Sequence, residues 1–399
     1  MICVALVFTT IVAAITYYIF EYTAFLKEDP VTQTVFIDRE DSLTQNVVLA
    51  ENVSYQVESV IQNLSVPWSI AFTNEQRMLI TERNGDVRVA LKDENENWQL
   101  ETEPLHSFEG VSSRSEEGLM GMALDPNYSE NNYVYFCYAY INDNSEMVDR
   151  VSRLTDNGDS LSEEFVLIDD IPAAQYHAGC QLGFGPDDKL YITTGDATDR
   201  WLAQDLDSLA GKMLRLNPDG SIPEDNPFDD SPIWSYGHRN SQGFDWYPGT
   251  DILYASEHGP SLFDGPAGGD EINLIKKGGN YGWPEVSHEE SMEGMIDPEL
   301  VFTPAIAPSG AIFYDSELIP EFKNNFFVAM LRGEGILRVV LDEQNPERII
   351  MHEKLDIDVG RIRALQTDSN GILYFATSNV DGRGQVNPED DQIYRLVPR

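Results

Sequence analysis

Basic residues are few for a chain of this size. The 399 residues include 26 lysines and arginines against 68 aspartates and glutamates, which gives a formal net charge of −42. Proteins that bind nucleic acids need basic surfaces to neutralise phosphates, so this deficit argues against a nucleic-acid partner. The acidic residues are spread along the chain instead of forming a tail, which is typical of a strongly hydrated surface suited to salty surroundings.

Cysteine is also scarce, with three residues in the whole chain. Three cysteines do not make the disulfide framework of a small secreted domain. Cys3 lies in an apolar run, which leaves Cys137 and Cys180 as the two that remain to pair. We expect these two residues to be buried free thiols.

Charge is absent from the first twenty residues, MICVALVFTTIVAAITYYIF. An apolar run of this length is just long enough to cross a hydrocarbon core as a helix, so residues 1–26 are predicted to be a signal peptide or a membrane anchor. The run has neither a basic start nor a clean cleavage site, which favours retention as an anchor. We expect the domain to lie outside the cytoplasm, secreted or held at the membrane through this segment alone.

Helical periodicity is weak in the rest of the chain. Residues 27–54 are polar without a helical period and are expected to form a tether. From Tyr55 onward a pattern recurs at spacings of about 50 to 65 residues: an apolar pair, a turn of Pro, Asp, Asn or Gly, and a strand. The six copies are AFTNEQRMLITE (71–82), ALDPNYSENNYVYFCYA (123–139), GFGPDDKLYITTGD (183–196), DWYPGTDILYASE (245–257), IFYDSELIPEFKNNFFVAML (312–331) and LQTDSNGILYFATS (365–378).

This repetition predicts an all-β, six-bladed β-propeller over residues 55–399. Each copy has the pattern of a hairpin of period-two strands, and blades arranged in a ring bury their faces against one another. We expect the ring to close by pairing a strand near residues 55–62 with the last strand, DQIYRLV at 391–397. Loops from equivalent corners of the blades would then meet at one end of the central channel, so residues distant in sequence can share a site.

Histidine is rare as well, with six in the chain, and His177 stands immediately before the inner strand of the third repeat. On a propeller this is a loop position facing the channel, where a histidine can act as a general base near neutral pH. Asp196 ends the strand that follows and could orient the imidazole ring. The alternative is a histidine with a purely structural role.

The few arginines recur near the later repeats. Arg239 stands near the fourth repeat, Arg332 follows the fifth, and Arg361 and Arg363 stand just ahead of the sixth. Residues i and i+2 of a strand share a face, so the last two guanidinium groups are suited to bind a carboxylate or phosphate together. For each arginine taken singly, the alternative is a surface ion pair.

Glycine and turn residues crowd the segment from Gly237 to Pro284, which contains GHRNSQG, SEHGP and GGDEINLIKKGGNYGWPE. A D-x-[DN]-x-[DN]-G calcium loop is absent. The Gly259-Pro260 turn and the GGNYGW turn can nevertheless expose backbone carbonyls, and Asp270 and Glu271 add carboxylates, which are the oxygen ligands that Ca²⁺ prefers. The alternative is a glycine-rich bend with surface acids.

The run GKMLRLNPDGSIPEDNPF (211–228), with IWSYGHRNSQG, SEHGP and DEINLIKKGGNYGWP after it, closely resembles the soluble quinoprotein glucose dehydrogenases. This group includes the aldose sugar dehydrogenases and the glucose/sorbosone dehydrogenases, which are six-bladed propellers that use pyrroloquinoline quinone (PQQ). The resemblance covers roughly residues 60–397. It implies PQQ- and Ca²⁺-dependent oxidation of aldose sugars at the anomeric carbon to lactones, with electrons passed to an external acceptor.

The resemblance also implies roles for individual residues. His177 would take the proton from the anomeric hydroxyl of the sugar, and Arg239 and Asn240 would contact PQQ. The carbonyls of Gly259 and Pro260 would hold the catalytic Ca²⁺.

Further positions follow from the same resemblance. Arg361 and Arg363 would bind carboxylates of PQQ. Glu271 and Tyr281 look like ligands of a second, structural Ca²⁺ seen in family members.

Three positions depart from the family pattern. Glu116, in SEEGLMG, stands where these enzymes place a glutamine beside the cofactor, and Arg332 aligns with a PQQ-contacting lysine. Thr303 stands where a tryptophan helps to enclose glucose, so a broad aldose range is expected.

Two other functions stay open. One is a propeller that binds without turnover, like the related module of hedgehog-interacting protein, and the other is a Ca²⁺-dependent lactonase. His177 together with the arginine pair favours the enzyme over the first, and the inward arginines speak against the second.

Overall fold

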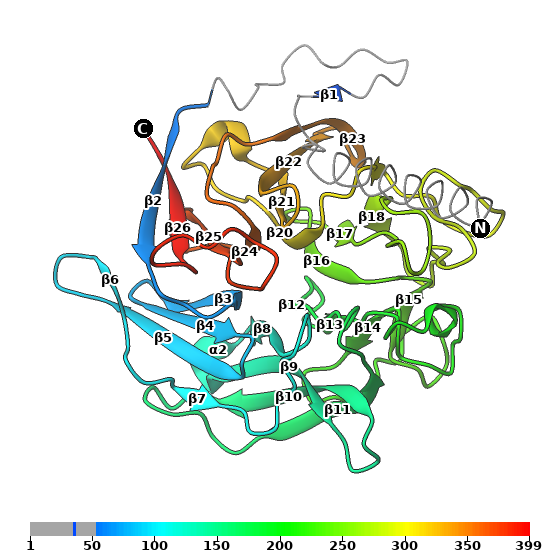
Figure 1. The fold of residues 1–399 in the computed structure, drawn as a ribbon, viewed down its shortest axis with the longest axis horizontal. Helices are drawn as coiled ribbons and strands as arrows, with labels where there is room; N and C mark the ends of the chain where they lie inside the picture. Colours follow the sequence, from blue (N-terminus) through cyan, green and yellow to red (C-terminus); the bar gives the residue numbers. More distant parts are fainter. Residues whose placement is uncertain (1–34, 37–52) are drawn as a thin grey trace, which may run out of the picture.

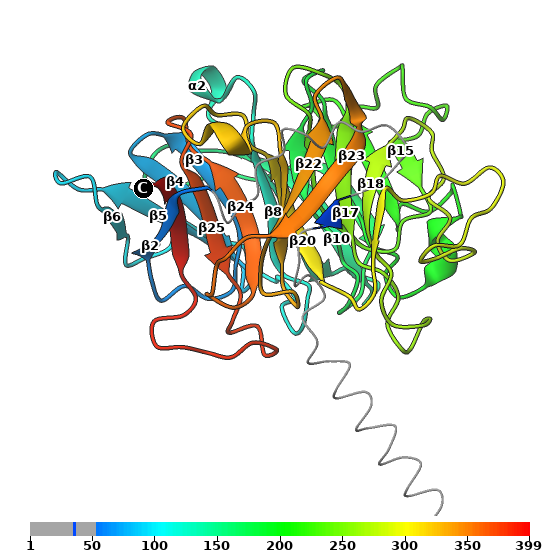
Figure 2. The same ribbon diagram turned by 90° about the horizontal axis from the view of Figure 1, so that it is seen from above.

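The protein is a six-bladed β-propeller in the computed structural model, which describes residues 35–36 and 53–399. Six antiparallel sheets surround a central axis, with the first strand of each nearest the axis (Figure 1), and Figure 2 shows the ring edge-on. The fold predicted from the repeats is confirmed.

The blades follow one another along the chain. Blade 1 contains β3 (Pro67–Asn74), β4 (Arg77–Glu82), β5 (Asp86–Lys92) and β6 (Trp98–Leu100), with β7 (His106–Ser107) paired to β5. Blade 2 contains β8 (Leu119–Leu124), β9 (Tyr133–Ile141), β10 (Met147–Thr155) and β11 (Phe165–Pro172). Blade 3 contains β12 (Leu182–Phe184), β13 (Leu190–Thr193), β14 (Lys212–Leu216) and β15 (Ile233–Tyr236).

The second half repeats this order. Blade 4 contains β16 (Ser241–Trp246), β17 (Leu253–Glu257), β18 (Asp270–Ile275) and β19 (Leu300–Phe302). Blade 5 contains β20 (Pro308–Phe313), β21 (Phe326–Met330), β22 (Gly335–Asp342) and β23 (Asn345–Lys354), and blade 6 contains β24 (Ile362–Thr367), β25 (Leu373–Thr377), β26 (Ile393–Pro398) and β2 (Tyr55–Ile61). The short helices are α2 (Tyr128–Asn131), η3 (Arg200–Ala203) and η4 (Pro320–Phe322).

The two ends of the propeller close the ring in blade 6. Strand β2 pairs antiparallel with β26, with Tyr55 opposite Pro398 and Ile61 opposite Ile393. This is the predicted closure, and it makes β2 the outer edge of blade 6.

The segment ahead of β2 is described only in part. Strand β1 (Val35–Phe36), which lies within the expected tether, adds to the outer edge of β23. The predicted signal or anchor segment, residues 1–26, lies outside the described residues. Within the described part of the chain, no helix is long and apolar enough to span a membrane.

The hydrophobic core lies between neighbouring blades. Strands in a propeller face other sheets on both sides, so the sequences of many strands are continuous apolar runs. In β21, FFVAM, all five residues are buried. One core cluster joins blades 2 and 3 through Tyr135, Cys137, Cys180 and Leu214. Burial at about 25 cal/mol per Å² of apolar surface makes these interfaces the main stabilising term of the ring.

The expectation of two free thiols is wrong. Cys137 in β9 and Cys180 in the loop before β12 form a disulfide with a Cα–Cα distance of 6.3 Å. Their separation of 43 positions in the sequence hides the fact that the ring places these two segments side by side. Because Cys180 follows His177 by three positions, the bond ties the loop of the candidate base to blade 2.

Removing this disulfide should lower the free energy of unfolding by about 4 kcal/mol, because it closes a long loop in the unfolded chain. The measurement is denaturant unfolding of the Cys137→Ala/Cys180→Ala variant beside the wild type. The wild type treated with reductant should move toward the variant. An unfolding midpoint that is the same for all three samples would contradict the role assigned to the bond.

Candidate active site

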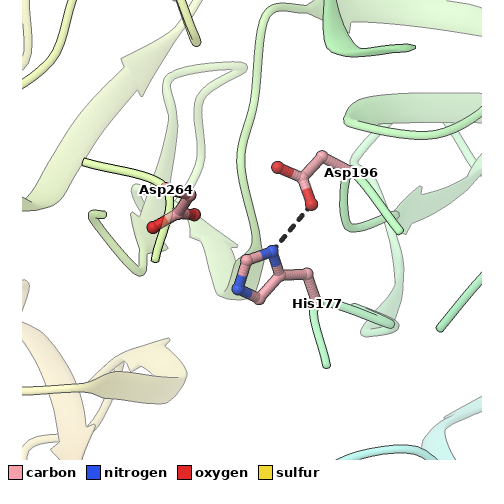
Figure 3. A group of neighbouring side chains, drawn as sticks. All are labelled: His177, Asp196 and Asp264. Atoms are coloured by element: carbon pink, nitrogen blue, oxygen red, sulfur yellow. Dashed lines mark hydrogen bonds and ion pairs between the residues drawn. The ribbon is translucent and has the colours of Figure 1, made fainter. Parts of the chain in front are cut away.

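His177 is held in one tautomer by Asp196. The residue lies on the loop between β11 and β12, is buried, and its Nδ1 lies 2.7 Å from Oδ1 of Asp196 (Figure 3). The second oxygen of Asp196 accepts from Nε1 of Trp283 at 2.8 Å, so the carboxylate cannot turn away. Because a carboxylate accepts, Nδ1 carries the proton and Nε2 keeps its lone pair. The structure brings the predicted base and its orienting acid into contact, and their catalytic roles stay predictions.

Arg239 lies against the second ring nitrogen of His177. Its Nη2 donates to Nε2 at 2.7 Å, and its Nε donates to Oδ2 of Asp264 at 2.8 Å. The guanidinium also lies over the ring of Trp283, 5.7 Å from the centroid. The site therefore places a fixed cation and a basic lone pair at the same point.

His177, Asp196 and Asp264 have the chemistry of a metal site. Their ligand atoms all lie within 4.8 Å of one another, with Nε2 of the imidazole on the side of Asp264 (Figure 3). The Arg239 guanidinium, however, hydrogen-bonds to both His177 and Asp264. The cluster is arranged around an organic cation, not around a metal ion.

Three buried nitrogen atoms near this point have no hydrogen-bond partner among the described residues: Nδ2 of Asn240, Nε2 of His258 and Nε of Arg363. Burial lowers the pKa of His258 to about 3, and the charges that act on this ring belong to Glu116, Arg239, Arg363 and His177. Buried nitrogens are normally paired, so the set indicates polar groups that a ligand rich in acceptor oxygens could satisfy.

The arginine pair of blade 6 is buried but not equivalent. Arg361 donates twice to Oδ2 of Asp381, at 3.1 and 2.7 Å. Arg363 donates to Oε1 of Gln242 at 2.7 Å and lies 3.8 Å from the centroid of the Trp68 ring. Burial lowers the pKa of Arg363 to about 9. Arg361 is already paired with a carboxylate, whereas the partners of Arg363 are uncharged, so an anionic ligand would stabilise Arg363 more.

Glu116 lies beside the base and has a cationic partner that the sequence did not reveal. Its Oε1 accepts from the guanidinium of Arg383, which lies on a loop of blade 6, at 2.8 Å. Its Oε2 accepts from the backbone N–H of His177. Burial alone would raise the pKa of Glu116, but the Arg383 guanidinium helps to bring it down to about 2. Arg332 is half-buried after β21, and its role stays a prediction.

The predicted calcium residues share one small cavity. Gly259, Pro260, Glu271 and Tyr281 line a space of about 10 Å³ together with Glu257. This is close to the volume that one water molecule needs. Burial raises the pKa of Glu271 well above its usual range, and the charge of Glu257 raises it further. A cation in this cavity would relieve both effects.

Two neighbours of this cavity are already engaged. Both oxygens of Asp270 accept from backbone N–H groups, of Gly259 at 2.8 Å and of Ala307 at 2.6 Å. The hydroxyl of Tyr281 donates to the carbonyl of Leu274 at 2.6 Å and accepts from the N–H of Lys276. Asp270 therefore shapes the turn, and the Tyr281 hydroxyl would have to give up one of these bonds to bind a metal.

Several residues of the site carried no signal in the sequence. Asp264 and Phe263 come from the loop after Pro260, and the Phe263 ring stacks on His177 with centroids 5.7 Å apart. His258 and Trp283 lie inside the turn-rich segment, where only their positions in SEHGP and NYGWP pointed to the site. Arg383 was hidden because its loop has no motif.

The sequence matches one family of known proteins over most of its length. Residues 64–393 match the family model Glucose / Sorbosone dehydrogenase. The chain is 30% identical over 360 residues to aldose sugar dehydrogenase YliI of Escherichia coli, covering 84% of this chain and 92% of that protein.

Two solved structures are similar along their whole length. An oxidoreductase from Thermus thermophilus, described as a glucose dehydrogenase, has a TM-score of 0.77 at 38% identity, covering 86% of this chain and 100% of that one. The PQQ-bound aldose sugar dehydrogenase of Streptomyces coelicolor has a TM-score of 0.74 at 32% identity, covering 87% and 99%.

The Glu116–Arg383 pair should make stability depend on pH in the acid range. The pKa of Glu116 in the folded state lies below its ordinary value, so its contribution is present above that ordinary value and is lost as the pH falls toward about 2. Glu116→Gln should reduce this acid loss, measured as melting temperature between pH 5 and pH 2. Arg383→Gln should reduce it in the same window. Identical pH profiles for both variants and the wild type would contradict the pairing.

Proposed function

The chain belongs to the glucose/sorbosone dehydrogenase family, and we propose that it oxidises aldose sugars at the anomeric carbon to lactones with PQQ and Ca²⁺. The observation that carries the proposal is the His177 ring, whose Nδ1 is bound to Asp196 and whose Nε2 faces a guanidinium donor. This is a general base with a stabiliser of negative charge beside it, in a site shielded from water.

The proton moves to His177. The anomeric hydroxyl gives its proton to Nε2, and the Asp196 carboxylate stabilises the imidazolium that results. The hydroxyl oxygen gains negative charge as the proton leaves, and the N–H group of Arg239 that now faces Nε2 lies next to that oxygen. A fixed donor at the point where charge develops lowers the barrier.

Cofactor binding is supported by the unpaired donors. Arg363 and Asn240 each have a buried N–H without a partner among the described residues, and these groups would hold carboxylate or quinone oxygens of PQQ. Arg361 and Arg332 are the other two residues that the resemblance assigns to the cofactor. PQQ, when bound, supplies a two-electron acceptor for the hydride of the anomeric C–H. An external acceptor then removes these electrons.

Metal binding is supported by the cavity between Glu257 and Glu271. The Gly259-Pro260 turn lines the same cavity, so two glutamates and a turn that can offer backbone carbonyls border a space of ion size. These residues would hold Ca²⁺ and fix the turn that carries Pro260.

The alternatives have less support. A module that only binds has no need of a buried base whose tautomer is fixed by a second buried acid. A lactonase centred on a metal would not place the Arg239 cation among its acidic side chains. The apolar run at residues 1–20 supports a location outside the cytoplasm, secreted or membrane-anchored.

Reconstitution tests this function. Purified apoprotein given PQQ and Ca²⁺ should bleach an artificial dye acceptor when aldoses are added. His177→Ala should lower this rate by about 10²- to 10⁴-fold, because the general base is lost, while PQQ remains bound.

His106→Ala removes a histidine in blade 1 and is the matched control, with activity retained. Absence of PQQ binding at micromolar cofactor would contradict the proposal, and so would equal activity of the His177→Ala variant and the wild type.

A further inference from the structure

Asp264 binds the guanidinium that meets the catalytic base. Its Oδ2 accepts from Nε of Arg239 at 2.8 Å, while Nη2 of the same guanidinium donates to Nε2 of His177 at 2.7 Å. Among the described residues, Asp264 is the carboxylate that pairs with this side chain. The three side chains therefore form one chain of contacts: carboxylate, guanidinium and imidazole.

The Asp264 carboxylate is itself held in place. Its Oδ1 accepts from the backbone N–H of Ser261 at 2.6 Å. Its backbone carbonyl accepts from Nη1 of Arg200 at 2.8 Å, which joins the loop to η3. Both oxygens and the main chain are thus fixed, so the carboxylate presents Oδ2 in a defined direction.

Arg239 has no equally strong anchor elsewhere among the described residues. Its side chain is 3% exposed, against 10% for that of Asp264. Apart from the contact with His177, the other hydrogen bonds of its guanidinium go to neutral groups and are longer, to the carbonyl of His258 at 3.2 Å and to Oγ of Ser261 at 3.4 Å. A buried cation takes the orientation that its strongest partner imposes, so Asp264 decides where Nη2 points.

We propose that Asp264 is a positioning residue, which fixes Arg239 so that one N–H group faces the lone pair of His177. The substrate hydroxyl replaces the hydrogen bond between these two nitrogens, which move apart as it enters; it gives its proton to Nε2 and receives a hydrogen bond from Arg239. Asp264 touches neither the substrate nor the proton. Its effect on the rate comes through the orientation of the Arg239 guanidinium, and this kinetic consequence rests on the proposed function.

The test compares four variants of the full chain, loaded with PQQ and Ca²⁺. Asp264→Asn removes the charge but keeps the shape, and Asp264→Glu keeps the charge. Arg200→Ala cuts the tie between the loop and η3 without changing the carboxylate. Asp207→Asn removes an exposed acid on a neighbouring loop and controls for the loss of one negative charge.

Steady-state kinetics with an aldose and a dye acceptor give the first readout. Asp264→Asn should lower kcat on the order of 10- to 100-fold, the size expected when a reacting group is misplaced, with a smaller change in KM. Asp264→Glu should recover part of this loss. Asp207→Asn should match the wild type, and Arg200→Ala should lose less than Asp264→Asn.

A second readout does not need activity. In apoprotein carrying ¹⁵N-labelled histidine, Nε2 of wild-type His177 should give the signal of a ring nitrogen that accepts a hydrogen bond. In Asp264→Asn this signal should move toward that of a free unprotonated nitrogen. His238, buried between Ser235 and Glu257, reports an intact fold through its unchanged signals.

Three results would overturn the inference: a kcat for Asp264→Asn close to that of the wild type, an unchanged His177 spectrum, or equal losses for Arg200→Ala and Asp264→Asn. Failure of the proposed function has a different signature, because the wild type would then oxidise no aldose. The histidine spectra would in that case still decide whether Asp264 positions Arg239.

Discussion

Ring closure is the constraint on which the site depends. The hydrogen bonds between β2 and β26 join the two ends of the propeller in blade 6, the blade that carries Arg363 and Arg383. His177 comes from the loop that leads into blade 3, and Glu116 precedes blade 2. The contact between Glu116 and Arg383 spans 267 residues of sequence, so it forms only when the blades complete the circle. The complete site therefore exists only in the closed ring.

Within the closed ring, buried charges organise the chemistry. Removing charged groups from water is costly unless each finds a partner with good geometry. The Asp196 carboxylate meets His177 and Trp283, and Arg239 meets His177 and Asp264. The strongly acidic surface contributes hydration, while three of the chain's few cations, Arg239, Arg361 and Arg363, are buried. The same logic explains why a cluster with metal-like ligands surrounds a guanidinium.

The sequence was informative where repetition or spacing reports geometry. The six repeats predicted the blades and the closing strand, and the position of His177 ahead of an inner strand predicted a base beside Asp196. Contacts between loops were out of reach, because nothing in the spacing of Asp264 or Arg383 shows which loops meet. The pairing of Cys137 with Cys180 was missed for the same reason: it depends on blades 2 and 3 being neighbours in space. The residues of the two calcium sites expected from the resemblance line one cavity, a result that only side-chain packing could give.

The central claim is that this site removes a proton and a hydride from the anomeric position of an aldose. The most direct test is rapid mixing of the PQQ-loaded, Ca²⁺-containing protein with an aldose that carries either hydrogen or deuterium at C1, with cofactor reduction followed by absorbance. The account predicts reduction in a single turnover that is slower with the deuterated sugar. Absence of cofactor reduction by any aldose would contradict it.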